Sequence, residues 1–113
     1  KKVQKRNMFW GQVVKQGQPF HLVWREGYPS LRLSNAALGS QENTGKHFIY
    51  VEVDGKKHMI GILVSGRVDQ KYVDLYFEQG QDVTFSVLGK SEVYLSGYFE
   101  ADDDEDDFED MDS

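Results

Sequence analysis

Acidic residues have the strongest chemical character in this sequence, and they are crowded at one end of it. Of the 19 Asp and Glu residues in the 113-residue chain, ten lie between Glu100 and Ser113, a stretch with no Lys or Arg. Six consecutive acids run from Asp102 to Asp107, and Phe108 and Met111 are apolar residues near them. Such a polyanion attracts basic proteins, and apolar residues between charges can anchor it. The alternative is a tail that only keeps the protein soluble.

Histidine is the next residue type that could carry chemistry. His21, His47 and His58 each lie in an expected strand, and none is spaced like a paired metal ligand. The chain has no cysteine, which excludes a thiolate zinc site and a disulfide framework. We expect His47 and His58 to face each other across a hairpin, as a cross-strand pair on a solvated edge rather than a metal site or general base. With no nucleophile elbow, phosphate-binding glycine loop or paired-carboxylate motif, the sequence predicts no catalytic residue, metal or cofactor.

The distribution of charge narrows the class of protein. The formal net charge is −6, but Lys1 to Arg6 holds four basic groups and no acid, and the body from Asn7 to Phe99 holds nine of each sign. A balanced body predicts no Lys/Arg-rich surface for nucleic acid. No apolar run approaches the ~18 residues of a membrane span, and no apolar signal-peptide core follows the basic start. We therefore expect no membrane association, no secretion, and a reducing setting in the cytoplasm or nucleus.

The elements that position these residues are expected to be strands. His47, Ile49, Val51 and Val53 alternate with polar and aromatic neighbours, which is the period of a pleated strand. Asp54-Gly55 follows, and both residues tolerate the positive φ angles of a type I′ hairpin turn. The returning strand is expected through Met59 to Val64, with Gly61 allowing a bulge or close approach.

Other alternating runs, separated by turns, bring the expected number of strands to about eight. The fold class is therefore all-β, an antiparallel sandwich or jelly roll, formed by residues 8–99 between a basic head (1–7) and a disordered acidic tail (100–113). Ser40 to Gly45 is expected to be a loop. Most aromatic residues are in phase with aliphatic neighbours and are expected in the core, whereas Tyr94 and Tyr98 occupy the opposite face from Val93 and Leu95. We expect these two tyrosines at a subunit interface. The remaining runs cover residues 8–15, 20–25, 31–34, 72–77, 82–88 and 91–99.

Several motifs, taken in order, resemble those of nucleoplasmin-like domains, in particular the domains of nuclear FKBP-type prolyl isomerases and of plant nucleolar histone-deacetylase-like proteins. The similarity runs from Met8 onward and ends in the acidic tract. The motifs are Phe9-Trp10-Gly11, Val14 to Pro19, Leu33 to Leu38, Tyr50 to Gly55, Val73 to Phe77 and Val93 to Tyr98.

The resemblance implies an eight-stranded jelly roll that assembles as a ring pentamer, sometimes with two rings stacked, and binds core histones as a chaperone in the nucleus or nucleolus. The segment from Ser40 to Gly45 holds only Glu42 as an acid, so histone binding through that loop is not expected. No prolyl isomerase activity is predicted for these 113 residues. The histone-binding role falls on Asp102, Asp103, Asp104, Glu105, Asp106, Asp107, Glu109 and Asp110.

Two other functions are compatible with the sequence. One is a passive oligomerisation module of a prolyl isomerase, whose tail only solubilises. The other is a nucleic-acid binder that uses Lys1 to Arg6 and surface aromatics, although no sequence-specific DNA binding is predicted. Histone binding that disappears with the tail would separate the first hypothesis from both alternatives.

Overall fold

The protein was analysed as a computed structural model that describes residues 6–39 and 45–101. This part of the chain is built of strands joined by turns, and it contains no helix. The head before Arg6, most of the Ser40 to Gly45 loop and the acids after Ala101 lie outside the described residues. The strands are β1 (Met8–Val14), β2 (Phe20–His21), β3 (Ser30–Leu38), β4 (Lys46–Val53), β5 (Lys56–Val64), β6 (Gln70–Glu78), β7 (Val83–Leu88) and β8 (Val93–Glu100).

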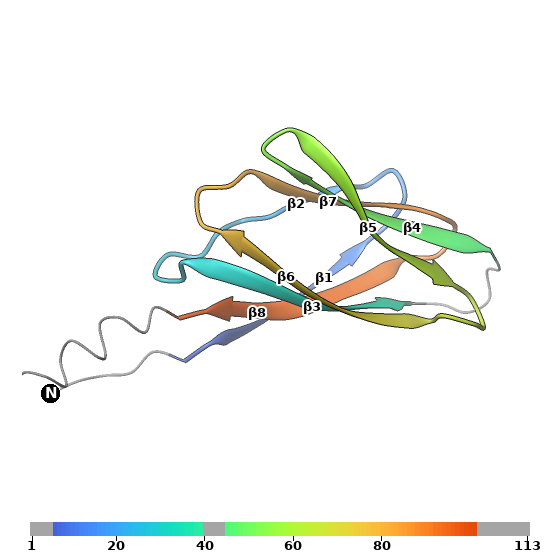
Figure 1. Cartoon of the computed structure of the whole chain (residues 1–113), viewed down its shortest axis with the longest axis horizontal. Coiled ribbons are helices and arrows are strands. Elements are labelled where there is room, and N and C mark those ends of the chain that lie inside the picture. Colours follow the sequence, from blue (N-terminus) through green and yellow to red (C-terminus); the bar gives the residue numbers. More distant parts are fainter. Residues whose placement is uncertain (1–5, 40–44, 102–113) are drawn as a thin grey trace, which may run out of the picture.

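Two antiparallel four-stranded sheets pack as the layers of a sandwich (Figure 1). The first sheet has the order β1-β8-β3-β6, and the second has the order β2-β7-β4-β5. Successive strands cross between the layers except at the β4–β5 hairpin, so the chain winds as a jelly roll. The predicted all-β class and antiparallel jelly-roll architecture are confirmed.

The predicted hairpin is present. Val53 pairs with Lys56, and the turn residues Asp54 and Gly55 have φ values of 51° and 86°. These positive angles at both central positions match the twist of the two flanking strands. The register shifts between Ile49 and Tyr50, so the returning strand has a bulge beside Gly61, where the glycine suggested one.

Two strands differ in length from the sequence expectation. β2 ends at His21, although the backbone N–H of Leu22 still donates to the Val83 carbonyl at 2.8 Å. β3 continues through the small residues to Leu38, because Ala36 is buried and a register shift between Leu33 and Asn35 keeps the strand paired with β6 and β8.

Large aromatic rings fill the core between the sheets. Phe85 of β7 is fully buried, and the ring centroids of Trp10 and Phe77 each lie 5.7 Å from its own. Trp10 and Phe77 belong to the first sheet, so these contacts join the two layers. Together with the buried aliphatic side chains they give one continuous core.

The expected His47–His58 pair is wrong. In the observed register His47 pairs with Leu63 and His58 pairs with Val51. His47 points inward with Ile49 and Val51 and is fully buried, whereas His58 is exposed. Among the described residues, neither ring nitrogen of His47 has a hydrogen-bond partner. The hairpin turn and the bulge together set this register, which places the two histidines at different positions along the strands.

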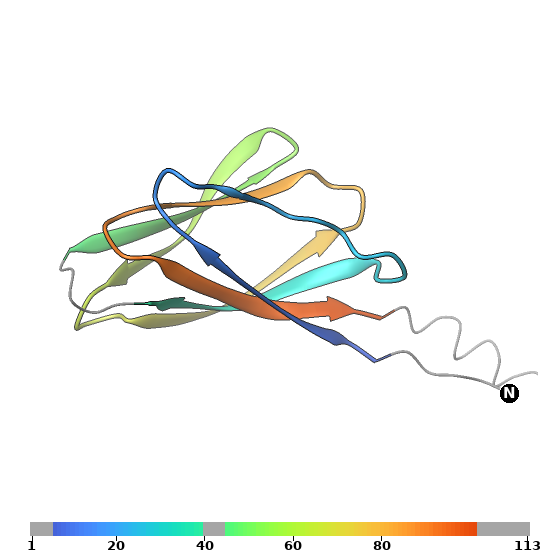
Figure 2. The same ribbon diagram turned by 180° about the vertical axis from the view of Figure 1, so that it is seen from behind.

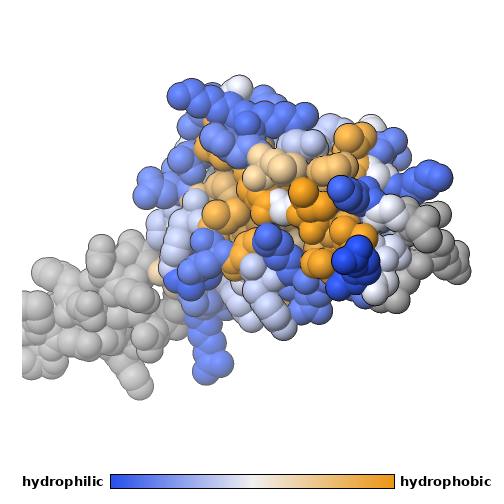
Figure 3. Space-filling model, turned by 45° about the vertical axis from the view of Figure 1, so that its right-hand side comes forward, coloured by the Kyte–Doolittle hydropathy of each residue, from blue (hydrophilic) through white to orange (hydrophobic). Residues whose placement is uncertain are grey.

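One side of the sandwich is formed by the edge strands β5 and β6. Figure 3 shows an apolar patch on this side, bordered by hydrophilic residues. Half-buried side chains such as Ile60 and Val73 come from these two strands and pack against the core. The aliphatic stem of Lys71 lies near Gly61, where an added Cβ would be 3.3 Å from its Cδ atom.

Candidate functional site

Exposed aromatic side chains gather on the outer face of the first sheet. The face is contributed by β1, β8, β3 and β6, whose inward-pointing residues alternate with these outward ones. We call it the aromatic face and define it by five residues with their exposed fractions, Phe9 (67%), Tyr72 (77%), Tyr76 (52%), Tyr94 (45%) and Tyr98 (45%). Five large rings on one sheet face exceed the scattered apolar exposure that is usual for a monomer.

The register places one row of these rings side by side across the whole sheet. Phe9 is opposite Tyr98, Tyr98 is opposite Arg32, and Arg32 is opposite Tyr76. The rings of Phe9 and Tyr98 meet edge to face, with centroids 6.1 Å apart. The guanidinium carbon of Arg32 lies 4.4 Å from the centroid of Tyr76, a cation–π contact. The row is therefore held together before any partner binds.

A groove of about 410 Å³ lies on the aromatic face between β1 and β8. Its lining includes Gly11 and Ser96, which pair in the sheet, with Phe9, Val13 and Tyr94 around them. Small residues between larger ones make this hollow. An added Cβ at Gly11 would come within 3.2 Å of the Phe9 ring, so glycine leaves room for both the ring and the groove.

The position of Tyr94 is fixed by a neighbouring carboxylate. Its hydroxyl donates to Oε2 of Glu92 at 2.9 Å, and the other carboxylate oxygen lies 3.8 Å from Nζ of Lys15. The hydrogen bond to Glu92, reinforced by the negative charge of that carboxylate, raises the pKa of Tyr94 above its ordinary value. Tyr94 therefore stays neutral and oriented at physiological pH.

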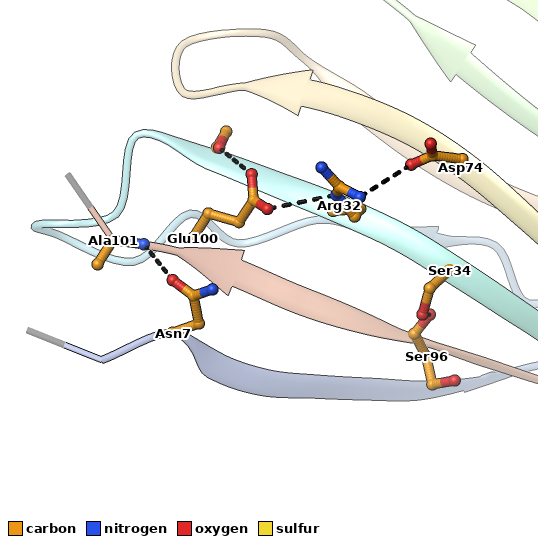
Figure 4. Close-up of polar contacts among 8 residues, drawn as sticks. Asn7, Arg32, Ser34, Asp74, Ser96, Glu100 and Ala101 are labelled. Atoms are coloured by element: carbon orange, nitrogen blue, oxygen red, sulfur yellow. Dashed lines mark hydrogen bonds and ion pairs between the residues drawn. The ribbon is translucent and has the colours of Figure 1, made fainter. Parts of the chain in front are cut away.

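The start of the acidic stretch is fastened to the first sheet (Figure 4). The Glu100 carboxylate lies 3.3 Å from Nε of Arg32 and accepts a hydrogen bond from the Ser30 hydroxyl at 3.3 Å. Arg32 also pairs with Asp74 at 3.4 Å, and the Ala101 N–H donates to Oδ1 of Asn7 at 2.8 Å. Seen from behind, β1 and β8 lie side by side and antiparallel, so β1 begins at the end of the sandwich where β8 finishes (Figure 2). In the sequence, the acids from Asp102 onward therefore follow two residues, Glu100 and Ala101, that are bonded to the first sheet and to Asn7.

Of the residues singled out in the sequence, Tyr94 and Tyr98 lie where the alternation placed them, outward and on one face. The eight tail acids, Asp102 to Asp107, Glu109 and Asp110, fall outside the described residues. Within residues 6–39 and 45–101, no group of three or more His, Asp or Glu side chains is arranged to hold a metal ion. The same part of the chain has no helix of the length and apolar character needed to cross a membrane.

Sequence reasoning missed part of the aromatic face. The outward placement of Tyr72 and Tyr76 could have been predicted, because they alternate with the inward residues Val73, Leu75 and Phe77. The outward placement of Phe9 could not have been predicted, since Phe9 is next to Trp10 and either ring could have faced the core. Arg32 contacts Glu100, Asp74 and Tyr76, which lie on strands far from it in the sequence. No local sequence pattern predicts these contacts.

Comparisons with known proteins agree on one family. The family model for the nucleoplasmin-like domain matches residues 9–100. The chain is 32% identical over 100 residues to FK506-binding protein 4 of Rhizopus delemar and to the 46 kDa FK506-binding nuclear protein of Spodoptera frugiperda, covering 88% of this chain in both cases. It is 35% identical over 92 residues, or 80% of this chain, to histone deacetylase HDT1 of Solanum chacoense. The chain spans 25%, 24% and 34% of the lengths of these relatives, respectively.

Solved structures give the same result for the fold. The nucleoplasmin-like N-terminal domain of Drosophila FKBP39 superposes with a TM-score of 0.72 at 22% identity, covering 90% of this chain and 97% of that one. The Drosophila NLP core, whose structure is described as giving insight into pentamer formation and histone binding, has a TM-score of 0.68 at 25% identity, covering 87% of this chain and 100% of that one. With a family match across residues 9–100, a jelly roll of eight strands and these structural neighbours, the chain belongs to the nucleoplasmin-like domain family.

Proposed function

We propose that this chain is a ring-forming, histone-binding chaperone domain of a nuclear protein, in which the acidic tail engages the basic histones. Binding rather than catalysis is the proposed activity. The observation that carries the proposal is the anchoring of Glu100 by Arg32 and Ser30 at the point where the acidic stretch begins. Nine further acids follow Glu100 in the sequence, so the polyanion begins directly after an anchored residue.

The family supports the same proposal. A solved relative is described in terms of pentamer formation and histone binding, and another relative is called a nuclear protein. The aromatic face, with Tyr94 and Tyr98 on it, is the surface that we propose to be buried between subunits. In a ring of five such chains the tails would bring together about 50 acidic groups, which raises both the rate and the avidity of binding to a basic partner.

The test is a truncation designed from the structure. Removing residues 102–113 keeps Glu100 and Ala101, which complete β8 and its contacts. The matched control keeps the full length but replaces every Asp and Glu from 102 to 112 by Asn or Gln. We expect both variants to lose most affinity for core histones at low salt, and the binding of the intact chain to weaken as salt rises above ~0.1 M, where the Debye length is about 10 Å.

Different outcomes separate the hypotheses. Unchanged histone affinity in both variants at low salt would refute the proposed role of the acidic tail in histone binding. Light scattering of the intact chain with and without core histones tests ring formation and histone binding together. A ring whose mass does not increase when histones are added would be a passive oligomerisation module. Substituting Phe108 and Met111 by Ser, with all charges kept, measures whether apolar anchors add to the electrostatic attraction.

A further inference from the structure

A second apolar surface lies on the outer face of the second sheet. One row of outward side chains runs Leu88–Phe48–Ile62, and the next runs Ser86–Tyr50–Met59. Leu88 is 50% exposed and Met59 is 53% exposed, whereas the other three apolar side chains are half-buried. We call this surface the second apolar face and define it by Phe48, Tyr50, Met59, Ile62 and Leu88. The charged residues near it indicate which partner it fits.

Basic side chains without ionic partners come from the strands that carry this face and from the turn beside them. In the first sheet, Arg32 and Lys15 are paired with carboxylates. Within the described part of the chain, no ion pair involves the five basic residues of β4, β5, the β5–β6 turn and the start of β6. One of the five, Lys57, has its Nζ atom 4.7 Å from the ring centroid of Tyr50. The five are Lys46, Lys56, Lys57, Arg67 and Lys71.

The acids of the same segments are fewer, and most are already satisfied. Residues 46–71 contain three acids against the five bases. Asp54 and Asp69 each accept a hydrogen bond from a backbone N–H, at 2.9 Å and 2.8 Å, and the third acid is Glu52. Asp82, beside the hairpin turn, lies 3.3 Å from Nδ1 of His21. The excess of unpaired basic groups on β4 and β5 therefore favours an anionic partner for the second apolar face.

The chain carries an anionic segment that also has apolar anchors. Nine acids lie from Asp102 to Asp112, and Phe108 and Met111 stand among them. We propose that this segment binds the second apolar face of its own protomer, with its two apolar side chains on the face and its acids toward the basic residues. A methionine suits such a face, because its sulfur makes favourable contacts with rings such as that of Tyr50.

The inference gives the second apolar face a regulatory role. It rests on the proposed function, because an acidic tail that is held on its own body must be released before it can engage a histone. The face is then an autoinhibitory docking site, and a histone must compete with it for the tail.

The hairpin turn lies toward the end of the sandwich where β8 finishes (Figure 1). The ring of Phe99 packs against that of Trp24, with centroids 6.1 Å apart, and the indole N–H of Trp24 donates to the Gln81 carbonyl at 2.9 Å. The next residue, Asp82, exchanges two hydrogen bonds with Asp54 of the turn. The tail therefore starts near the turn end of the second apolar face.

The segment after Ala101 is long enough for the proposed contact. Phe108 and Met111 follow Ala101 by seven and ten residues, which extend to about 24 Å and 34 Å. The path to the face crosses ~10 Å between the sheets and ~13 Å along the four residues from the turn to Tyr50 or Met59. Phe108 therefore reaches the row nearest the turn, and Met111 can reach the next row.

A weak contact is sufficient, because both partners belong to one chain. A short flexible linker gives an effective concentration in the millimolar range. At about 1 mM, a contact with a dissociation constant of about 0.1–1 mM would hold roughly half to nine-tenths of the tails. Only the released tails bind histones at once, so docking should lower the apparent histone affinity by about two- to tenfold.

Paramagnetic relaxation tests the docking in the full chain, which has no cysteine of its own. Ser113→Cys carries a nitroxide label and keeps every acid and both apolar anchors. At low salt we expect the label to broaden the methyl signals of Met59 and Ile62, and to leave those of Val13 on the aromatic face unchanged. In 1 M salt, where the Debye length is about 3 Å, the broadening should disappear.

Two controls use the same nitroxide label. Replacing Phe108 and Met111 by Ser in the labelled chain keeps all charges, and we expect it to remove the broadening of Met59. Refolding the labelled chain together with an isotope-enriched chain that carries no label should give no broadening, because the tail docks on its own protomer.

Histone affinity gives a separate measurement. Met59→Ser with Leu88→Ser removes the two most exposed side chains of the second apolar face, and Val68→Ser is the matched control at a 41% exposed position in the β5–β6 turn. We expect the double variant to bind core histones about two- to tenfold more tightly than the parent chain at low salt. The Val68→Ser variant should bind as the parent chain does.

Each failure has its own meaning. Equal broadening on both faces, broadening of the aromatic face alone, or broadening between chains in the mixture would overturn the docking of the tail on its own second apolar face. The expected broadening together with unchanged histone affinity in the Met59 and Leu88 double variant would overturn the inhibitory role. A parent chain that binds no histones would overturn the proposed function, whereas the relaxation measurement is made without histones and does not depend on that result.

Discussion

Gly97 of β8 lies against the backbone of β3 without space for a side chain. An added Cβ would be 3.0 Å from Cα of Leu33 and closer still to the carbonyl oxygen of Arg32, whereas carbon and carbonyl oxygen stay about 3.3 Å apart in close sheet contacts. The obstacle is backbone, which cannot rotate away as a side chain can. Gly97→Ala must therefore push β3 from β8 at the middle of the first sheet.

The expected loss of stability follows from these contacts. Overpacking alone costs about 1–3 kcal/mol, and separating β3 from β8 weakens inter-strand hydrogen bonds worth about 1 kcal/mol each. We expect Gly97→Ala to lower the free energy of unfolding by about 4 kcal/mol, a large part of the 5–15 kcal/mol that holds a typical domain together. Urea unfolding at one fixed protomer concentration measures the loss, since an oligomer's stability depends on concentration.

The matched control is Gly61→Ala, at a buried strand glycine of the second sheet. Its nearest obstacle is the flexible end of Lys71 at 3.3 Å, so we expect a change within about 1 kcal/mol. If Gly97→Ala were as stable as Gly61→Ala to within 1 kcal/mol, the argument from backbone contact would be refuted.

Two further predictions concern single side chains. His47→Leu removes a buried ring whose nitrogens lack a hydrogen-bond partner among the described residues, so we expect thermal unfolding to show stability unchanged or raised by about 1 kcal/mol. Glu92→Gln removes the negative charge beside Tyr94, so the pKa of that phenol should fall toward its ordinary value. Absorbance titration of Glu92→Gln against the parent detects this change, with Tyr94→Phe identifying the signal. Because the pKa of Tyr94 is raised, its hydroxyl should keep its proton and its hydrogen bond to Glu92 at a pH where an ordinary tyrosine has already ionised, and lose the bond only at higher pH.

Local patterns determined which parts of the fold could be predicted from the sequence. The Asp54-Gly55 hairpin and the inward sides of β6, β7 and β8 follow from turn chemistry and a period of two, both of which act between near neighbours. The outward placement of Tyr94 and Tyr98 follows from the same alternation.

Features set by register could not be predicted in the same way. The partner of His47 on β5 depends on a bulge at Ile49/Tyr50, and the length of β3 depends on another between Leu33 and Asn35. Each bulge shifts the pairing by one residue and turns the strand beyond it to its other face. The network around Arg32 needs three strands in their final order, so only the folded chain brings it together.

The pairing of β1 with β8 has a consequence for synthesis. β1 is an edge strand whose only partner in the first sheet is β8. The first strand of this domain therefore cannot pair until the last strand has been synthesised. At roughly 5–20 residues per second, the ribosome needs on the order of 4–16 s to make the ~80 residues that separate them. During that interval Phe9 and Trp10 lack the sheet that later holds them. We expect the emerging chain to rely on chaperones until β8 arrives, and to fold slowly for its size because its contacts are long-range.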